Sequence, residues 1–417
     1  MVRRLLAIGF IFAGATVAWM ILGATIFSRT YDLDVSSKAK VASSWGTAQR
    51  QMPPTASYDT TSMRKEITTE NGRRVERTVP TTETTYLPLE SSKIAVALEV
   101  EHRQKGLLWY TLYKVKFDGG YGYTNNTAKD QTVRFSVRFP AERAIYDDFV
   151  FAVNGQPLAL TNEGNLMQGY VNVAAGKTVP VRLAYRSQGQ DTWHYSFGDE
   201  VSQVKNFDLS MKTKFKDIDF PENTLSPTTR REAPDGWELD WSYKNLVSGF
   251  DIGMVMPQKL QPGPLAGRIS FFAPVSLFFF FFLIFIITTL RNIDLHPMNY
   301  FFLAAAFFAF HLLLAYTVDH ISIHLAFLIC SLVSIFLVVS YLRLVVGIRF
   351  AAVEAALAQL VYLIFFSYAF FFKGFTGLTV TVIAIITLFV VMQMTGRVDW
   401  SDKFARLPRA GGKAAAR

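Results

Sequence analysis

The sequence has 417 residues, of which 51% are hydrophobic, and a formal net charge of +9. Most of the excess positive charge lies beside apolar segments and not in a basic stripe interleaved with aromatic residues. This distribution argues against nucleic-acid binding and is typical of the charge pattern that orients membrane proteins. The single cysteine, Cys330, excludes a disulfide framework within one chain and a zinc site made of several cysteines.

Long apolar segments predict a protein that crosses the membrane six times. Each segment is long enough to span a hydrocarbon core of about 30 Å at the α-helical rise. Residues 1–4 include the basic Arg3 and Arg4 and are expected to be a cytoplasmic N-terminus. They precede the first span, 5–27, which lacks a clear cleavage site and is therefore expected to remain as an anchor. The other five spans form a bundle over residues 270–396, at about 271–290, 298–318, 321–342, 350–372 and 375–395.

Basic residues in the short loops predict the orientation of the chain. Arg3, Arg4, Arg291, Arg343, Arg349 and the basic tail 397–417 all fall on one side if the spans alternate. Because short loops rich in Lys and Arg face the cytoplasm, we expect both termini there. The large region between the first two spans is then extracytoplasmic.

This outer region has the pattern of β structure. Residues 28–58 are expected to form a stalk that leads into a β-rich domain over 59–269. The pairs Asn71-Gly72 and Asn154-Gly155 predict hairpin turns, and residues 221–236 are expected to form a loop. Six β-rich stretches predict strands of an all-β, sandwich-like domain: IAVALEVEH, TLYKVKF, TVRFSVRF, VPVRLAYR, WHYSF and FDLSMKTKF.

The outer domain lacks the usual signatures of an enzyme. It contains no GxSxG elbow, no HExxH pair and no phosphate-binding glycine loop. The acidic pairs Asp147-Asp148 and Asp199-Glu200 are interpreted as solvated strand edges. We therefore expect a binding module without a cofactor and not an enzyme. Aromatic side chains that either fill the core, as we expect for most, or anchor a partner are Trp109, Tyr110, Trp193, Trp237 and Trp241.

Two interpretations fit the polar stretch TVDHISIH between the third and fourth spans. In the first, it is a turn at the membrane surface, and Asp319 caps the N-terminus of the fourth span. In the second, His311, His320 and His324 gather into a metal or proton site. The sequence favours the turn, with each buried histidine bonded to a carbonyl or hydroxyl group inside the bundle.

Two further polar residues lie in the fifth span. Glu354 is expected to reach the cytoplasmic surface or to pair with Arg349 or Arg343, and Gln359 to bond another helix. Alternatively, Glu354 and Gln359 line a polar path together with His311 and His324, which would indicate a small transporter or channel.

The stretch LHPMNYFFLAAAFFAFHLLLAYTVDHISIHLAF resembles the CreD family of bacterial inner-membrane proteins, also called cell envelope integrity proteins. MTGRVDW after the last span resembles the closing signature of the family. Matching positions in the membrane half are His296, Pro297, Tyr300, Asp319, His320, Thr395, Arg397, Asp399 and Trp400. The chain departs from the pattern at Asp319, where the family usually has Glu, and at Lys373-Gly374, which replaces acidic residues.

Two stretches of the outer domain also resemble the family. SSWGTAQRQMPP matches at Trp45, Gly46, Gln49, Gln51 and Pro53. VEHRQKGLLWYTLYKVKFDGGY matches at Glu101, Arg103, Gly106 and Tyr113.

The resemblance implies a multi-pass protein of the bacterial inner membrane that contributes to envelope integrity or stress tolerance. It brings no catalytic residues. The expected partners are the lipid bilayer and an envelope protein or cell-wall component bound by the outer domain, and oligomerisation is compatible with this arrangement.

Overall fold

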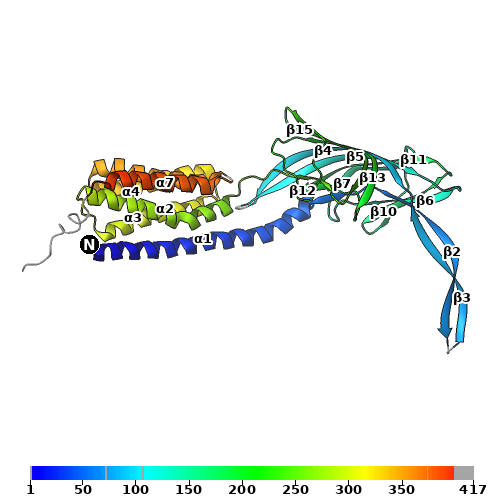
Figure 1. The fold of residues 1–417 in the computed structure, drawn as a ribbon, viewed down its shortest axis with the longest axis horizontal. Coiled ribbons are helices and arrows are strands. Elements are labelled where there is room, and N and C mark those ends of the chain that lie inside the picture. The colour runs from blue at the N-terminus through cyan, green and yellow to red at the C-terminus, as the bar shows by residue number, and fades with distance from the viewer. Residues whose placement is uncertain (1, 71–72, 106–107, 373, 399–417) are drawn as a thin grey trace, which may run out of the picture. The chain divides into compact units, whose positions relative to one another are not determined.

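The computed structural model describes residues 2–70, 73–105, 108–372 and 374–398. They form two compact units. One is helical and consists mainly of the residues up to Ser36 and from Leu260 onward, and the other is β-rich and consists mainly of Ser37–Lys259. Figure 1 shows the helices and strands of both units.

Within the part of the chain that the structure describes, the helical unit contains six helices that are long and apolar enough to cross a membrane. One precedes the β-rich unit and five follow it, which confirms the predicted fold class. Five of the six are α1 (Val2–Trp45), α2 (Pro262–Leu290), α3 (Pro297–Thr317), α4 (Ile323–Val345) and α7 (Thr376–Thr395).

The remaining span, the fifth, changes its helical geometry along its length. It begins with a π-helical turn, η1 (Phe350–Ala355), followed by α5 (Ala356–Gln359) and a second π-helical turn, η2 (Leu360–Phe365). It ends with α6 (Phe366–Tyr368) and the 3₁₀ turn η3 (Ala369–Phe371). Because π-helical turns inside a helix are rare and often occur at functional sites, the polar residues of this span are candidates for a functional site.

Side-chain caps define the N-termini of α3 and α4. His296 caps α3 by accepting a hydrogen bond from the Met298 amide at 3.2 Å, and Pro297 occupies the first turn. α4 is capped by Ser322, whose hydroxyl accepts from the Leu325 amide. The prediction that Asp319 caps α4 is therefore wrong, because the chain makes another turn before the helix begins.

The first helix is longer than the predicted span. α1 continues through much of the predicted stalk to Trp45, because residues 28–45 contain neither Gly nor Pro. It ends at Gly46, which has φ +84° and donates its amide to the Ala42 carbonyl at 2.9 Å. Strand β1 (Gln49–Gln51) follows directly.

The β-rich unit contains three sheets. The largest has the order β14-β15-β13-β4-β5-β11-β7-β8, the second β3-β2-β6-β10-β9 and the third β1-β12-β16. The strands of the largest sheet are β14 (Thr229–Ala233), β15 (Gly236–Ser248), β13 (Ser202–Thr213), β4 (Leu89–Lys105), β5 (Leu108–Thr124), β11 (Thr178–Gln190), β7 (Tyr146–Val153) and β8 (Gln156–Pro157). The others are β2 (Thr55–Glu70), β3 (Arg73–Tyr86), β6 (Gln131–Arg138), β9 (Thr161–Glu163), β10 (Leu166–Val173), β12 (Thr192–Tyr195) and β16 (Ile252–Val255).

Alternating side chains build the core of this unit. β4 buries Ile94, Val96 and Leu98 and exposes the residues between them. Trp193 and Trp241 are fully buried in the same cluster. All six β-rich stretches predicted as strands lie in or overlap strands, so the prediction of sandwich-like β structure is confirmed.

The predicted turns have different outcomes. Asn154 and Gly155 both have positive φ and join β7 to β8 in a tight turn, as predicted. Asn71 and Gly72 lie outside the described residues, although β2 and β3 pair antiparallel up to Glu70 and Arg73.

The expected loop 221–236 instead contains β14. This polar edge strand has no apolar alternation that would reveal it in the sequence.

β2 and β3 form a two-stranded ribbon that extends away from the rest of the β-rich unit (Figure 1). β2 pairs with β6 only over Thr55–Ser57 in the described registers. Beyond Ser57, β2 has β3 as its neighbour.

A comparison of Gly46 with Gly155 distinguishes the effect of backbone strain on stability from the effect of steric crowding. Gly46 and Gly155 both have positive φ, but only at Gly46 would a Cβ atom lie 2.9 Å from a carbonyl oxygen, that of Gln188. We expect Gly155→Ala to lower the free energy of unfolding by about 1 kcal/mol and Gly46→Ala by at least about 2 kcal/mol. Urea unfolding of the full chain in detergent, followed by the β-sheet circular dichroism signal, measures both, and equal losses would contradict the expected crowding.

Candidate functional site

The exposed face of the eight-stranded sheet carries a groove of about 790 Å³. This volume is in the range of sites that bind small ligands. Ala97 on β4 is exposed at the groove and leaves its centre hollow, because its neighbours in the lining have longer side chains. Ile145, Pro234 and Trp237 contribute apolar surface, and Ile145 is 62% exposed.

Strand pairing aligns charged residues on both sides of Ala97. On one side, Ala97 lies opposite Lys212 of the parallel strand β13, and Lys212 lies opposite Glu238 of β15. Lys212 Nζ is 2.7 Å from Glu238 Oε1. This hydrogen bond and the charge of Lys212 lower the pKa of Glu238, so the pair stays ionised at neutral pH.

The other side of the groove begins at β5, the neighbour of β4. Here Lys116 lies directly opposite Arg186 of β11, and Arg186 lies opposite Asp147 of β7. The guanidinium of Arg186 binds both Asp147 and Asp148 at 2.8 Å. The two acidic residues expected to be solvated are thus exposed, and they also neutralise a cation of the groove.

Lys116 has no ion pair among the described residues. Two like charges directly opposite on antiparallel strands repel each other. The acidic residues that neutralise Lys212 and Arg186 lie farther out on the sheet, so positive charge remains at the centre of the groove beside Ala97. A bound anionic group at Lys116 would relieve this repulsion.

The aromatic residues considered as partner anchors separate into two groups. Trp193, Trp241 and Tyr110 are buried, as expected for core residues. Trp109 and Trp237 are half-buried, and Trp237 lines the groove.

The stretch SSWGTAQRQMPP contains β1 and attaches this strand to the β-rich unit. β1 runs parallel to β12 and buries Gln49 and Gln51. The Gln49 amide donates to Ser187 Oγ at 2.8 Å and to the Gln188 carbonyl at 2.9 Å, and the Tyr185 hydroxyl donates to Gln51 Oε1 at 2.6 Å. These buried contacts assign both glutamines a structural role.

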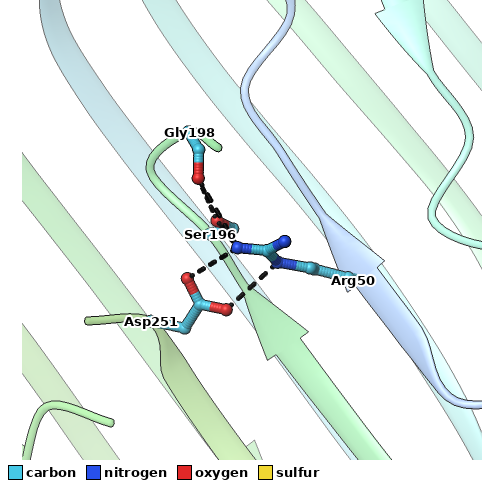
Figure 2. A network of polar contacts seen from close by, with 4 residues as sticks. All are labelled: Arg50, Ser196, Gly198 and Asp251. Atoms are coloured by element: carbon cyan, nitrogen blue, oxygen red, sulfur yellow. Dashed lines mark hydrogen bonds and ion pairs between the residues drawn. The ribbon is translucent and has the colours of Figure 1, made fainter. Parts of the chain in front are cut away.

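Arg50, between the two glutamines, points to the opposite side of β1 and forms the polar network of Figure 2. Its Nε and Nη2 atoms lie 3.1 and 3.4 Å from the two carboxylate oxygens of Asp251. Nη2 also donates to Ser196 Oγ at 2.8 Å and to the Gly198 carbonyl at 3.5 Å. One guanidinium therefore joins β1 to the segments that follow β12 and precede β16.

The residues of the second outer-domain stretch that resembles the CreD family, VEHRQKGLLWYTLYKVKFDGGY, also make structural contacts. The guanidinium of Arg103 lies 4.3 Å from the centre of the Trp45 ring, and Glu101 pairs with Lys114 at 3.4 Å. The Tyr113 hydroxyl donates to the Thr192 carbonyl at 3.0 Å. Gly106 lies outside the described residues.

In the helical unit, arginines hold α1 to the bundle. Arg29 lies 3.4 Å from Asp319 in the turn between α3 and α4, and donates to the Ala315 carbonyl at 2.8 Å. Arg4 lies 3.2 Å from Asp294 in the segment between α2 and α3. The acidic residue of the TVDHISIH stretch therefore binds α1 and does not cap α4.

Other residues of the helical unit that match the CreD pattern lie in different environments. Tyr300 is fully buried, and its ring packs edge-on against Phe281 at 5.2 Å. Arg397 is exposed, and Asp399 and Trp400 lie outside the described residues.

The three histidines of the alternative metal or proton site have separate surroundings. His311 is buried, bonds the Phe307 carbonyl through Nδ1 at 3.0 Å and packs edge-on against Trp19. His324 packs against Phe371, and His320 is exposed. Among the described residues, no three His, Cys, Asp or Glu side chains gather as metal ligands.

The fifth span bonds several of its neighbours. Glu354 in η1 pairs with Arg291, so the expected pairing with Arg349 or Arg343 is wrong. Gln359 bonds another helix as expected: its amide donates to Ser334 Oγ of α4 at 2.7 Å, and Ser334 donates to the Ala306 carbonyl of α3 at 2.9 Å.

Tyr362 in η2 extends these contacts. Its hydroxyl bonds Thr387 of α7 at 2.6 Å, and its carbonyl accepts a hydrogen bond from Ser276 of α2. Within the described ranges, no hydrogen bond or ion pair joins any two of the four residues of the alternative polar path, His311, His324, Glu354 and Gln359. Their contacts are those of a bundle held together by polar side chains.

Six apolar helices, with a β-rich unit inserted between the first and the second, define a multi-span membrane protein with one large extramembrane region. The family model described as inner membrane protein CreD matches residues 1–278 and 264–401. The chain belongs to the CreD family.

No curated protein matches the sequence. Among solved structures, one from Legionella pneumophila described as a nutrient-binding protein is 9% identical, with a TM-score of 0.32, and the match covers 56% of this chain and 76% of that one. An M1 zinc metallopeptidase from Deinococcus radiodurans is 10% identical, with a TM-score of 0.26, and the match covers 40% of this chain and 42% of that one. Likeness at this level carries no argument about function.

Arg50 gives a test of the β1 attachment. Arg182 makes a similar two-atom contact with Asp118, at 3.0 and 2.8 Å, but on the open face of the sheet. Because Asp251 is 19% exposed and Asp118 41%, and because Arg50 also serves Ser196 and Gly198, we expect Arg50→Lys to cost about 1 kcal/mol more than Arg182→Lys. Urea unfolding of the full chain in detergent measures the difference, and a larger loss for Arg182→Lys would disprove this role.

Gln359 and Ser334 give a test of the polar contacts in the bundle. Ser334→Ala leaves a buried amide without its acceptor, whereas Gln359→Leu removes the amide, whose Oε1 already has no partner. We expect Ser334→Ala to destabilise the bundle by about 1 kcal/mol and Gln359→Leu to be nearly neutral. Thermal unfolding in detergent distinguishes them, and the reverse order would show that the amide makes contacts beyond Ser334.

Proposed function

We propose that the protein contributes to the integrity of the bacterial cell envelope by binding an envelope component, without catalysing a reaction. The β-rich unit lies on the periplasmic side and carries the binding site, and the bundle holds it in the inner membrane. Membership of the CreD family supports the inner-membrane assignment. The basic short loops support the orientation, with both termini in the cytoplasm.

The groove on the eight-stranded sheet is the observation that carries the proposal. It combines a hollow centre at Ala97, exposed apolar surface at Ile145 and a cation, Lys116, without an ion pair among the described residues. Exposed apolar surface next to convergent charged groups is typical of a binding site.

Transport through the bundle is the weaker alternative. His311 and Gln359 both make their described bonds within the bundle, and Glu354 pairs with Arg291 at its end. These contacts bind the three side chains to separate partners and, among the described residues, form no continuous polar chain across the bundle. The contacts inside the bundle therefore favour a role as a membrane platform for the β-rich unit over a role as a channel.

Uptake of a membrane-excluded dye by a deletion strain under envelope stress tests the proposal. The strain is complemented with the intact gene, with Ala97→Tyr, which fills the groove, or with the triple variant His311→Ala, His324→Ala and Glu354→Ala. Because the groove carries the function, we expect Ala97→Tyr to fail and the triple variant to restore dye exclusion.

Ala95→Tyr is the matched control, because Ala95 is exposed on the same face of β4 but does not line the groove. All variants must reach the same membrane level, measured by immunoblotting. Rescue by Ala97→Tyr together with failure of the triple variant would contradict the binding proposal and favour transport.

A further inference from the structure

The charges that line the groove restrict the chemistry of its ligand. The lining contains five cations and four carboxylates: Lys114, Lys116, Arg186, Lys212 and Lys214, and Glu99, Asp147, Asp235 and Glu238. A densely anionic ligand, such as a phosphate-rich polymer, would meet four carboxylates and be repelled. A cationic ligand would meet Lys116 and Arg186. A ligand that carries both signs of charge fits this lining best.

Ion pairs within the groove leave two charged groups for a ligand. Lys114 is paired with Glu101, Lys212 with Glu238, Lys214 with Glu99 at 3.3 Å, and Arg186 with Asp147 and Asp148. Among the described side chains, Lys116 on β5 and Asp235 in the turn between β14 and β15 have no ion pair. Lys116 is therefore placed to bind a carboxylate, and Asp235 to bind an ammonium group.

The apolar surface of the groove favours small side chains on the ligand. The Trp237 ring is held by a hydrogen bond from Nε1 to the Lys216 carbonyl at 2.8 Å, and it forms a fixed wall with Pro234. Ile145 supplies exposed apolar surface, and Ala97 leaves room between the charged side chains. Methyl groups fit this space and bury apolar surface of the groove.

We propose that the groove binds a short zwitterionic peptide with free carboxylates, an ammonium group and alanine-like side chains, which is the chemistry of cell-wall peptides. A carboxylate of the peptide lies at Lys116, its ammonium group at Asp235 and its methyl groups against Ala97, Ile145 and Trp237. This assignment rests on the proposed envelope-binding function and specifies its ligand.

Isothermal titration calorimetry of the full-length protein in detergent micelles tests the assignment. The probe is N-acetylated Ala-Glu-Lys-Ala, which carries two carboxylates and one ammonium group. The comparison peptide has Gln in place of Glu and a C-terminal amide, and inorganic phosphate is the third probe. We expect the first peptide alone to bind.

Two groove variants and two matched controls locate the binding. Lys116→Glu is expected to weaken binding of the peptide about tenfold or more, because it removes one well-placed charged contact. Ala97→Tyr is expected to weaken binding by a similar factor, because the tyrosine ring occupies the space for the methyl groups. Lys93→Glu and Ala95→Tyr lie on the same face of β4 outside the groove, and are expected to leave affinity within about twofold.

The melting temperature of the ligand-free Lys116→Glu variant is a second measurement. The new carboxylate faces Arg186 and replaces a like-charge pair by an attractive one, so the variant is expected to fold and to melt at or above the temperature of the unchanged protein. Weaker peptide binding by such a stable variant cannot come from unfolding.

Several outcomes would overturn the peptide assignment. Equal binding of the two peptides, binding of phosphate in place of peptide, or peptide affinity that is unchanged by Lys116→Glu would each do so. Absence of peptide binding, together with failure of Ala97→Tyr in the dye assay, would overturn the ligand class alone. Rescue by Ala97→Tyr in that assay would overturn the proposed function as well.

Discussion

The β-rich unit depends on the two-residue alternation of side chains along its long strands. On β4, Ile94, Val96 and Leu98 enter the core, and Ala97 between them faces the groove. A slip of one residue would exchange the two sets, placing charges in the core and apolar residues in water. The strand register that keeps the core apolar therefore also assembles the charged groove, and the two cannot change independently.

A second constraint acts in the helical unit, because a polar group in hydrocarbon needs a partner. The Gln359 amide nitrogen and the Tyr362 hydroxyl meet this requirement by bonding neighbouring helices, and His311 Nδ1 by bonding a carbonyl of its own helix, whereas Gln359 Oε1 and His311 Nε2 have no partner among the described residues. The cations Arg4 and Arg29 lie near the two ends of the apolar part of α1 and each meets a carboxylate. The bundle is consequently fixed by polar contacts in its interior and by ion pairs at its ends.

Local patterns were sufficient to predict the spans, strands at the six β-rich stretches and the Asn154-Gly155 turn, but not the long strand β15. They did not reveal the partners of Asp319 and Glu354, because Arg29 and Arg291 are distant in the sequence and no periodicity links them. The groove was hidden for the same reason. Its charged residues come from separate strands, and β13 pairs with β4 in parallel, a connection that alternation along a single strand cannot indicate.

The β2–β3 ribbon has a consequence for how the family can diverge. Beyond Ser57, its described pairing is between its own two strands. Removing or adding two residues on each strand preserves both the register and the face on which each side chain lies. Evolution can therefore lengthen or shorten this ribbon in matched steps while the core of the β-rich unit and the groove keep their sequence, so ribbon length and groove chemistry are free to diverge separately.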